Sequence, residues 1–407
     1  MYNLCVVAFA CSAKSTVLPC GTTPKIKDFR TFLEIQSFAL AGKPTDANFV
    51  YFNILNGHSY FQRKERGMVT KIGLDLGYAN ITISDVSSGI FREPSVALID
   101  RESRRIASVG NAALSEENTN GMVLVRPFKN GLLFDHQLTQ GIINTAVKAV
   151  LPAERLRCVV GVPSDFLPKQ EKELFAMLNA AGVSDCFSVN RALAALVGAG
   201  YSPAMSVISV NIGAASTEIA VFSDGVITHT VREAVGGEDF DKAVKQYIYE
   251  QGDVNVSLSV ARAIKEKLGS VWSGKENDSV DIEGTLSLTG NRVKMNITTE
   301  DIIGVFEKPL HKLFMAVAGA IKKIPIDNVE KTFKNGIVLT GGASLIHGLD
   351  IMMSKVLGVS VTRPDDALDS VAKGLSRINT FIPVKGRAAN KNVTNSVAKY
   401  YENKKST

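Results

Sequence analysis

The stretch SVNIGAAST, residues 209–217, has the residue types of a phosphate-binding turn. It reads as a β-strand that runs into a turn of small residues and then into a second strand. A turn built of Gly213, Ala214, Ala215 and Ser216 lets backbone N–H groups approach a phosphate closely. The strand residue two positions before the glycine, where a carboxylate would help to hold a metal, is Asn211. The stretch therefore predicts either a nucleotide site that lacks this charge or a simple tight hairpin.

A similar pattern occurs earlier in the chain. Residues 72–83, IGLDLGYANITI, align with residues 208–219, ISVNIGAASTEI, at a constant offset of 136, so that Asp75 matches Asn211 and the turn glycines coincide. Two similar hairpins at a fixed offset are typical of an internally duplicated fold. If the hairpins face each other, their turns would form a clamp for a polyphosphate between two domains. Alone, a strand–glycine–strand unit is common in α/β proteins.

Three later segments could complete such a site. GIVLTGGASLIHGLD, residues 336–350, reads as a buried strand, a glycine turn and a helix, which presents backbone and a helix N-terminus to a ligand. Residues 234–248 place two glycines and several acids at the start of a helix, where the macrodipole favours negative charge. Residues 259–274 form an amphipathic helix pattern. The chain contains neither GxxxxGK[ST] nor GxGxxG, which excludes the common phosphate-loop and dinucleotide motifs.

Composition places the chain among globular proteins with more than one domain. The 407 residues are 45% hydrophobic and 21% charged, and no apolar run reaches the roughly 18 residues of a membrane span. The net charge of +6 comes from the two ends, because residues 68–383 carry −3, which argues against a nucleic-acid-binding face. The five cysteines form no CxxC pair and no cluster with histidine, so we predict no metal site on them, no disulfide framework and a cytoplasmic location.

The chain divides into five predicted parts. Residues 1–67 differ from the rest and are predicted to be a disordered leader or the product of a start codon placed too far upstream, with a genuine appendage as the alternative. Two α/β domains are predicted over 68–205 and 206–365, followed by a C-terminal helix over 366–383 that returns to the first domain. The basic residues 384–407 are predicted to be a disordered tail, with contact to an anionic surface as the alternative.

The ordered series of motifs resembles the actin superfamily, which includes actins, heat-shock chaperone ATPase domains and sugar kinases. In finer detail, KIGLDLGYAN, VRPFKNGLLFDH, VGGEDFDKAV, ARAIKEKLGSVWSG and GIVLTGGASLIHGLD resemble the landmarks of MreB, a family of bacterial actins that determine rod shape. The resemblance runs from about Met68 to about Asn379. It implies two RNase H-like domains that face each other across a cleft holding ATP and Mg²⁺.

The resemblance also implies roles for individual residues. Asp75 would bind the metal and, with the degenerate positions Asn211 and Arg191, would form the catalytic group. The nucleotide-binding residues implied by matching motifs are Gly77, Tyr78, Ala79, Asn80, Gly213, Ala214, Ala215, Ser216, Arg262, Lys265, Glu266, Gly341, Gly342, Ala343 and Ser344.

Two departures from the family pattern bear on catalysis. The family carries an acid in the second hairpin, where this chain has Asn211, and a Glu that orients the attacking water, where this chain has Arg191. The amide removes a charge that would hold Mg²⁺, and a guanidinium cannot accept a proton. Loss of general-base help costs about 10²- to 10⁴-fold in rate. We therefore expect at most a slow ATPase, in which Arg191 could pair with a γ-phosphate.

Three function hypotheses follow. The first is an ATP-binding cytoskeletal protein that forms filaments with itself or with an MreB paralogue and contributes to cell shape or intracellular positioning. The second is a partner-binding module with a locked nucleotide cleft, and the third is a small-molecule kinase. Peripheral membrane contact through Val150 and Leu151 is equally well explained by core packing.

Overall fold

A computed structural model describes most of the chain after residue 68. The described residues are 69–86, 89–116, 120–129, 132–133, 135–148, 155–272, 274, 276–382 and 391–405. The predicted leader and the apolar loop with Val150 and Leu151 lie outside these residues.

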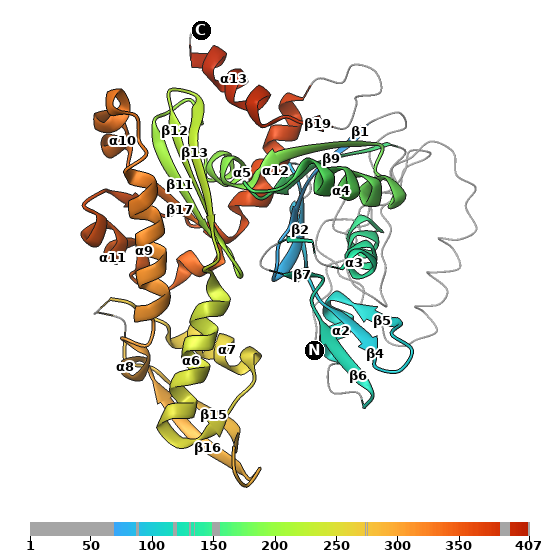
Figure 1. The fold of residues 1–407 in the computed structure, drawn as a ribbon, viewed down its shortest axis with the longest axis vertical. Coiled ribbons are helices and arrows are strands. Elements are labelled where there is room, and N and C mark those ends of the chain that lie inside the picture. Colours follow the sequence, from blue (N-terminus) through green and yellow to red (C-terminus); the bar gives the residue numbers. More distant parts are fainter. Residues whose placement is uncertain are drawn as a thin grey trace, which may run out of the picture.

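Domain I is built on a six-stranded sheet with the strand order β19-β10-β9-β1-β2-β3 (Figure 1). The first three strands in sequence form an antiparallel meander, and β9 and β10 then pair in parallel beside β1. The strands are β1 (Val69–Leu76), β2 (Asn80–Asp85), β3 (Gly89–Pro94), β9 (Arg155–Val162), β10 (Asp185–Asn190) and β19 (Lys391–Asn392).

Domain II is built on a five-stranded sheet with the order β13-β12-β11-β17-β18. Its first three strands are again an antiparallel meander, and β17 and β18 again add in parallel. The strands are β11 (Val207–Ile212), β12 (Thr217–Ser223), β13 (Val226–Glu233), β17 (Ile337–Thr340) and β18 (Val361–Thr362). The two sheets share one topology, which confirms the predicted α/β fold of two facing, duplicated domains.

Two helices, α5 (Arg191–Gly198) and α12 (Ser370–Phe381), pack between the two sheets (Figure 1). They cross very closely: a Cβ atom added to Gly198 would lie 1.6 Å from the Ser370 carbonyl oxygen, and one added to Gly374 would lie 1.8 Å from the Ala194 carbonyl oxygen. Because no side chain other than hydrogen fits at either position, the sequence fixes how near these helices approach. The crossing brings the start of α5 to the space between the domains.

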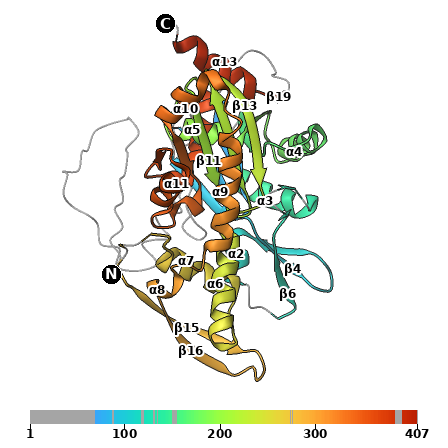
Figure 2. The same ribbon diagram turned by 60° about the vertical axis from the view of Figure 1, so that its left-hand side comes forward.

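Each domain also carries smaller elements beside its sheet, and those of domain II extend to the far end of the molecule in both views (Figures 1 and 2). In domain I they are β4 (Ala97–Asp100), β5 (Ile106–Val109), α2 (Gly110–Ser115), β6 (Met122–Val125), β7 (Phe128–Lys129), β8 (Leu132–Leu133), α3 (His136–Lys148) and α4 (Pro168–Ala180). In domain II they are α6 (Gly237–Gly252), β14 (Val254–Asn255), α7 (Leu258–Leu268), β15 (Ser279–Leu286), β16 (Arg292–Thr298), α8 (Thr299–Ile302), α9 (Glu307–Ile321), α10 (Val329–Asn335) and α11 (Leu349–Leu357). Short 3₁₀ turns are η1 (Ile326–Asn328), η2 (Gly342–Leu345) and η3 (Ala367–Asp369).

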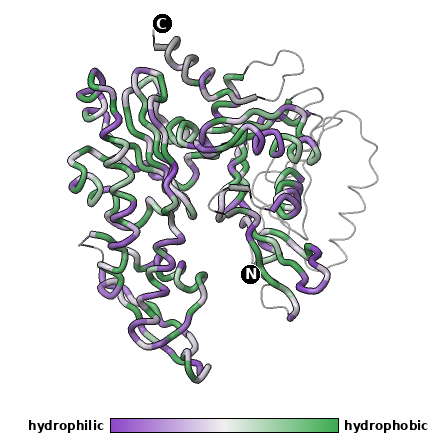
Figure 3. The backbone as a smooth tube through the Cα atoms, viewed as in Figure 1, coloured by the Kyte–Doolittle hydropathy of each residue, from purple (hydrophilic) through white to green (hydrophobic). Residues whose placement is uncertain are grey.

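The hydrophobic core follows the inner strands of both sheets. Every residue of β11 and of β12 is buried, as expected for strands covered on both faces. Hydrophobic residues run along these inner strands, whereas the turn between β4 and β5 is hydrophilic (Figure 3). Among the described residues, no helix has both the length and the apolar character needed to cross a bilayer.

The end of the chain differs from the prediction of a disordered tail over residues 384–407. β19 (Lys391–Asn392) pairs in parallel with β10, and α13 (Thr394–Lys405) follows it. Val393 and Val397 are buried in the core shared by the two domains. The tail was misjudged because its average composition is polar, although Val397 and Tyr401, four positions apart on α13, place one helix face on this core.

Candidate functional site

Two hairpin turns face a cleft of about 480 Å³ between the domains. Hairpin I joins β1 to β2, and hairpin II joins β11 to β12. Nearly all the predicted site residues line this cleft: Asp75, Gly77, Tyr78, Ala79, Asn80, Arg191, Asn211, Gly213, Ala214, Ala215, Ser216, Arg262, Lys265, Glu266, Gly341, Gly342 and Ala343. Segments up to 268 positions apart in sequence therefore meet at one place.

Both turns depend on their glycine. In hairpin I, a Cβ atom added to Gly77 would lie 2.6 Å from the Asn80 carbonyl oxygen, which is closer than real Cβ contacts. In hairpin II, the Gly213 N–H donates to the Ser216 carbonyl at 2.9 Å, and an added Cβ would lie 3.1 Å from the same oxygen. The turns are therefore compact, with backbone amides close to the cleft, as phosphate-binding turns require.

Helix α6 begins directly against hairpin II. The N–H of Gly237 donates to the Gly213 carbonyl at 2.9 Å, and the N–H of Glu238 donates to the Ala214 carbonyl at 2.8 Å. The Asp239 side chain accepts a hydrogen bond from the Gly236 N–H at 2.9 Å and so caps the helix. These contacts fix the positive end of the helix dipole beside the turn, where negative charge is favoured.

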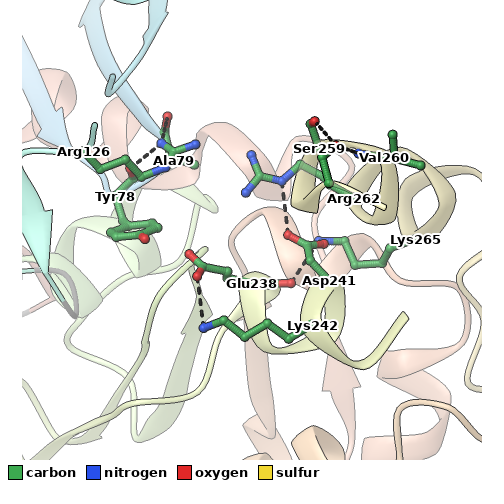
Figure 4. Close-up of polar contacts among 12 residues, drawn as sticks. Tyr78, Ala79, Arg126, Glu238, Asp241, Lys242, Ser259, Val260, Arg262 and Lys265 are labelled. Carbon is green, nitrogen blue, oxygen red and sulfur yellow. Dashed lines mark hydrogen bonds and ion pairs between the residues drawn. The ribbon is translucent and has the colours of Figure 1, made fainter. Parts of the chain in front are cut away.

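The predicted residues of α7 are held by a carboxylate that the sequence analysis missed (Figure 4). Asp241 of α6 is fully buried, and its carboxylate pairs with Lys265 Nζ at 2.6 Å and with Arg262 Nε at 3.2 Å. Lys265 Nζ also donates to the Gly237 carbonyl at 3.1 Å. Asp241 follows Glu238 by three residues, and this spacing places the two acids on the same face of α6. It orients both cations at the edge of the cleft.

The segment after β17 forms the remaining wall. Gly341 has φ +88°, and an added Cβ atom would lie 2.3 Å from the Ile212 carbonyl oxygen, so only glycine fits there. Gly342 and Ala343 line the cleft. Ser344 lies behind this wall: it is fully buried, and its hydroxyl donates to the Gly341 carbonyl at 2.6 Å. Its position indicates support of the turn rather than contact with a ligand.

The first hairpin's acid forms an ion pair with the first residue of α5. Arg191 Nε lies 3.2 Å from Asp75 Oδ1, and Arg191 Nη2 donates to the Leu76 carbonyl at 3.3 Å. Burial raises the pKa of Asp75, and the positive charge of Arg191 opposes this rise. The predicted metal ligand and the residue at the water-positioning site therefore contact each other.

The second hairpin contains an acid that the sequence analysis did not name. Glu218 on β12 pairs directly with Asn211 on β11, lines the cleft and is only 1% exposed. Its Oε2 accepts a hydrogen bond from the Ser164 hydroxyl of domain I at 2.9 Å. Burial raises the pKa of Glu218, although Arg191 acts in the opposite direction. The alignment of the two hairpins places Glu218 opposite Thr82, on the strand that follows the turn. This match puts the Glu218 side chain beside the turn and could have identified it.

Cationic and aromatic groups of domain I face the charged residues of α6 and α7 (Figure 4). The Arg126 guanidinium lies 5.2 Å from the centre of the Tyr78 ring and donates to the Tyr78 carbonyl at 3.0 Å. Burial and a hydrogen bond to Glu238 of domain II raise the pKa of Tyr78 to about 12. Burial lowers the pKa of Arg126, and the like charge of Arg262 lowers it further. Two arginines from opposite domains thus repel each other across the cleft.

The two-hairpin cleft agrees with the proteins to which this chain is similar. The family model described as MreB/Mbl protein matches residues 69–384. This chain belongs to the MreB/Mbl family. Among relatives of this family, the cell shape-determining protein MreB of Pasteurella multocida is 28% identical over 328 residues, which are 77% of this chain and 93% of that protein. The cell shape-determining protein Mbl of Bacillus cereus is 27% identical over 314 residues, which are 74% of this chain and 93% of that protein.

Solved structures of MreB5 and MamK share the fold. MreB5 of Spiroplasma citri bound to ADP superposes with a TM-score of 0.72 at 22% identity, over 76% of this chain and 96% of that one. A MamK double helical filament superposes with a TM-score of 0.68 at 20% identity, over 78% of this chain and all of that one. MreB5 has also been solved with AMPPNP. The likeness confirms the predicted actin-like fold.

Proposed function

We propose that this MreB/Mbl-family protein binds ATP in the cleft between its domains and assembles into filaments that contribute to cell shape or intracellular positioning. The observation that carries the proposal is the convergence of two glycine turns, one from each duplicated domain, on one cleft. The proposal places the protein in the cytoplasm and involves no nucleic acid. Contact with a membrane surface stays an untested prediction.

The charges around the cleft support an anionic ligand. Arg126 and Arg262 approach from opposite domains, and the positive charge of Arg262 lowers the pKa of Arg126. A polyphosphate between the domains would relieve this repulsion and draw the domains together. MreB5 of Spiroplasma citri, which has the same fold, is known with ADP and with AMPPNP. The negative charge of a bound nucleotide would therefore favour closure of the cleft between the domains.

Exposed apolar residues at opposite ends of domain II support self-assembly. Ile326 is 90% exposed at the start of the η1–α10 segment, and Phe333 lies exposed on α10. Leu288 is 92% exposed in the turn between β15 and β16, at the other end of the domain (Figure 1). Contact between two different ends of neighbouring copies does not close on itself and so generates a filament. A MamK relative with this fold has been solved as a double helical filament.

Sedimentation of the full-length protein tests assembly. At micromolar concentration with ATP, we expect wild type to pellet and Ile326→Asp to remain in the supernatant, because a charge would be buried in the contact. Met315→Asp is the matched control, since Met315 is 62% exposed on the side of the same domain. Wild type that stays in the supernatant with ATP, both alone and with an MreB paralogue, would overturn the filament proposal.

We propose that ATP hydrolysis is slow. A guanidinium at residue 191 supplies no base for the attacking water, and it is paired with Asp75. Phosphate release should therefore rise in Arg191→Glu and rise further when Asn211→Asp is added. If wild type already releases phosphate as fast as the double variant, the assignment of these two positions is wrong.

The Mg²⁺ predicted on Asp75 stays a prediction. Across the part of the chain that the structure describes, no group of three or more His, Cys, Asp or Glu side chains could hold a metal ion. Asp75 already has a guanidinium against one of its oxygens.

A further inference from the structure

Arg191 is fixed between the two hairpins. It is the first residue of α5, is 8% exposed and lines the cleft. Its Nη2 donates to the carbonyl of Leu76, the residue just before the turn glycine of hairpin I. The close crossing of α5 with α12 holds the helix itself in place. The guanidinium therefore occupies a position set by the fold rather than one chosen by a flexible surface side chain.

The hydrogen-bonding capacity of this guanidinium is not satisfied. Arg191 Nε and Asp75 Oδ1 are both buried, lie 3.2 Å apart and have no hydrogen-bond partner among the described residues, so their contact is an ion pair without good hydrogen-bond geometry. Glu218 Oε1 is also buried without a hydrogen-bond partner in the described structure. Burying these charged atoms with imperfect hydrogen-bond geometry is costly, so the pair leaves little freedom for the position of the guanidinium.

Arg191 also acts on acids from both domains. It forms the ion pair with Asp75 of hairpin I, and its charge favours the ionised form of Glu218 of hairpin II. Asn211, which is paired with Glu218 across the hairpin, carries no charge, and its Oδ1 accepts a hydrogen bond from the Thr340 hydroxyl at 3.2 Å. The Arg191 guanidinium thus places a positive charge near both Asp75 and Glu218, in the cleft that both hairpin turns face.

This arrangement competes with a divalent cation. Mg²⁺ requires near-octahedral oxygen ligands at about 2.0–2.1 Å and usually takes one or two carboxylates together with phosphate oxygens. Here the guanidinium already contacts the carboxylate of hairpin I, and hairpin II offers an amide at the matching position. A second cation placed against Asp75 would be repelled by Arg191 at short range.

We propose that Arg191 takes the place of the divalent cation, so that the cleft binds the terminal phosphates of metal-free ATP directly. The inference rests on the proposed nucleotide binding and specifies which form of the nucleotide is bound. A guanidinium offers a planar fork of N–H donors that matches two phosphate oxygens, and in Arg191 the terminal Nη1 and Nη2 would supply it, because Nε is buried against Asp75. Asp75 then orients the guanidinium and does not act as a metal ligand.

The test is calorimetric binding of ATP to the full chain, in buffer with excess Mg²⁺ and in buffer with EDTA. We expect wild type to bind at least as tightly in EDTA as in Mg²⁺. Arg191→Gln should lose about tenfold or more in EDTA, the cost of a charged phosphate contact, and should regain affinity when Mg²⁺ is added. Arg191→Lys, which keeps the charge without the fork, should lie between the two. Arg232→Gln is the matched control, because Arg232 pairs with Asp165 and does not line the cleft.

The outcomes separate this inference from the proposed function. Wild type that binds ATP ten times more tightly with Mg²⁺ than in EDTA would overturn the metal-free site but leave nucleotide binding intact. No binding of ATP in either buffer would overturn both. Equal loss in Arg191→Gln and in the control would show that affinity follows overall charge and would also overturn the assignment. Thermal unfolding of each variant distinguishes a binding defect from loss of the fold.

Discussion

The two hairpins have the same backbone and different charges. Each is an antiparallel pair with a glycine turn, and the two align at a constant offset of 136 residues. In hairpin I the first strand carries Asp75, which pairs with Thr82 on the second strand. In hairpin II the first strand carries Asn211, which pairs with Glu218 on the second. Each hairpin therefore keeps one acid, but on opposite strands.

The surroundings of the two acids differ as well. Asp75 is paired with Arg191 of its own domain, whereas Glu218 accepts a hydrogen bond from Ser164 of the other domain. The comparison separates two requirements of the site. The glycine turns set where a phosphate can lie, and this backbone is preserved in both copies. The side chains set which charges surround the phosphate, and these have diverged.

The largest expected effect comes from filling the turns. Gly77→Ala would place Cβ 2.6 Å from a backbone oxygen, so hairpin I must shift, and we expect ATP affinity to fall about tenfold or more. In Gly213→Ala the corresponding distance is 3.1 Å, and the expected loss is about threefold. Calorimetry on both variants checks the order. A greater loss for Gly213→Ala would show that the second turn, not the first, is the tighter of the two.

Removing the acid of hairpin II should give a smaller, pH-dependent effect. Because burial raises the pKa of Glu218, the folded state favours its protonated form, and stability is lost as the pH rises through the folded pKa. In acid, the thermal midpoint of Glu218→Gln should therefore be close to that of wild type. As the pH approaches neutrality, the midpoint of the variant should become a few degrees higher than that of wild type. The exposed Glu283→Gln is the control. A difference in thermal midpoint that does not change with pH would contradict a raised pKa of the buried Glu218 carboxyl.

The sequence predicted the parts of the site that depend on backbone and missed those that depend on packing. The turn glycines and the small-residue wall were visible because few other residues permit such turns. Arg126, Asp241 and Glu218 were missed because an isolated charge in a strand or helix usually lies on a solvated face, and only the fold shows which of them turn inward. α13 was missed for the related reason that two buried valines hardly change the average polarity of its segment.

The smallest expected effect concerns the contact across the mouth of the cleft. Tyr78 of hairpin I lies near Glu238 of α6, whose carboxylate raises the pKa of Tyr78 together with burial, and the Glu238 N–H donates to the Ala214 carbonyl of hairpin II. Tyr78→Phe keeps the ring beneath Arg126 and removes the hydroxyl, so ATP affinity should fall about two- to fivefold. Wild type should also show one more tyrosine that titrates at a pKa of about 12 than the variant, because Tyr401, whose pKa is also about 12, is present in both proteins. An absorbance titration that is the same for both proteins would remove Tyr78 from the interdomain contact.

The most direct test of the clamp is hydrogen–deuterium exchange of the full-length protein with and without saturating ATP. If both turns bind one polyphosphate, exchange should slow at residues 77–80 and at residues 213–216 together, and both should respond at the same ATP concentration. Slowing at one turn alone, or at neither while ATP is bound, would contradict the claim that the duplicated hairpins act as a single nucleotide clamp.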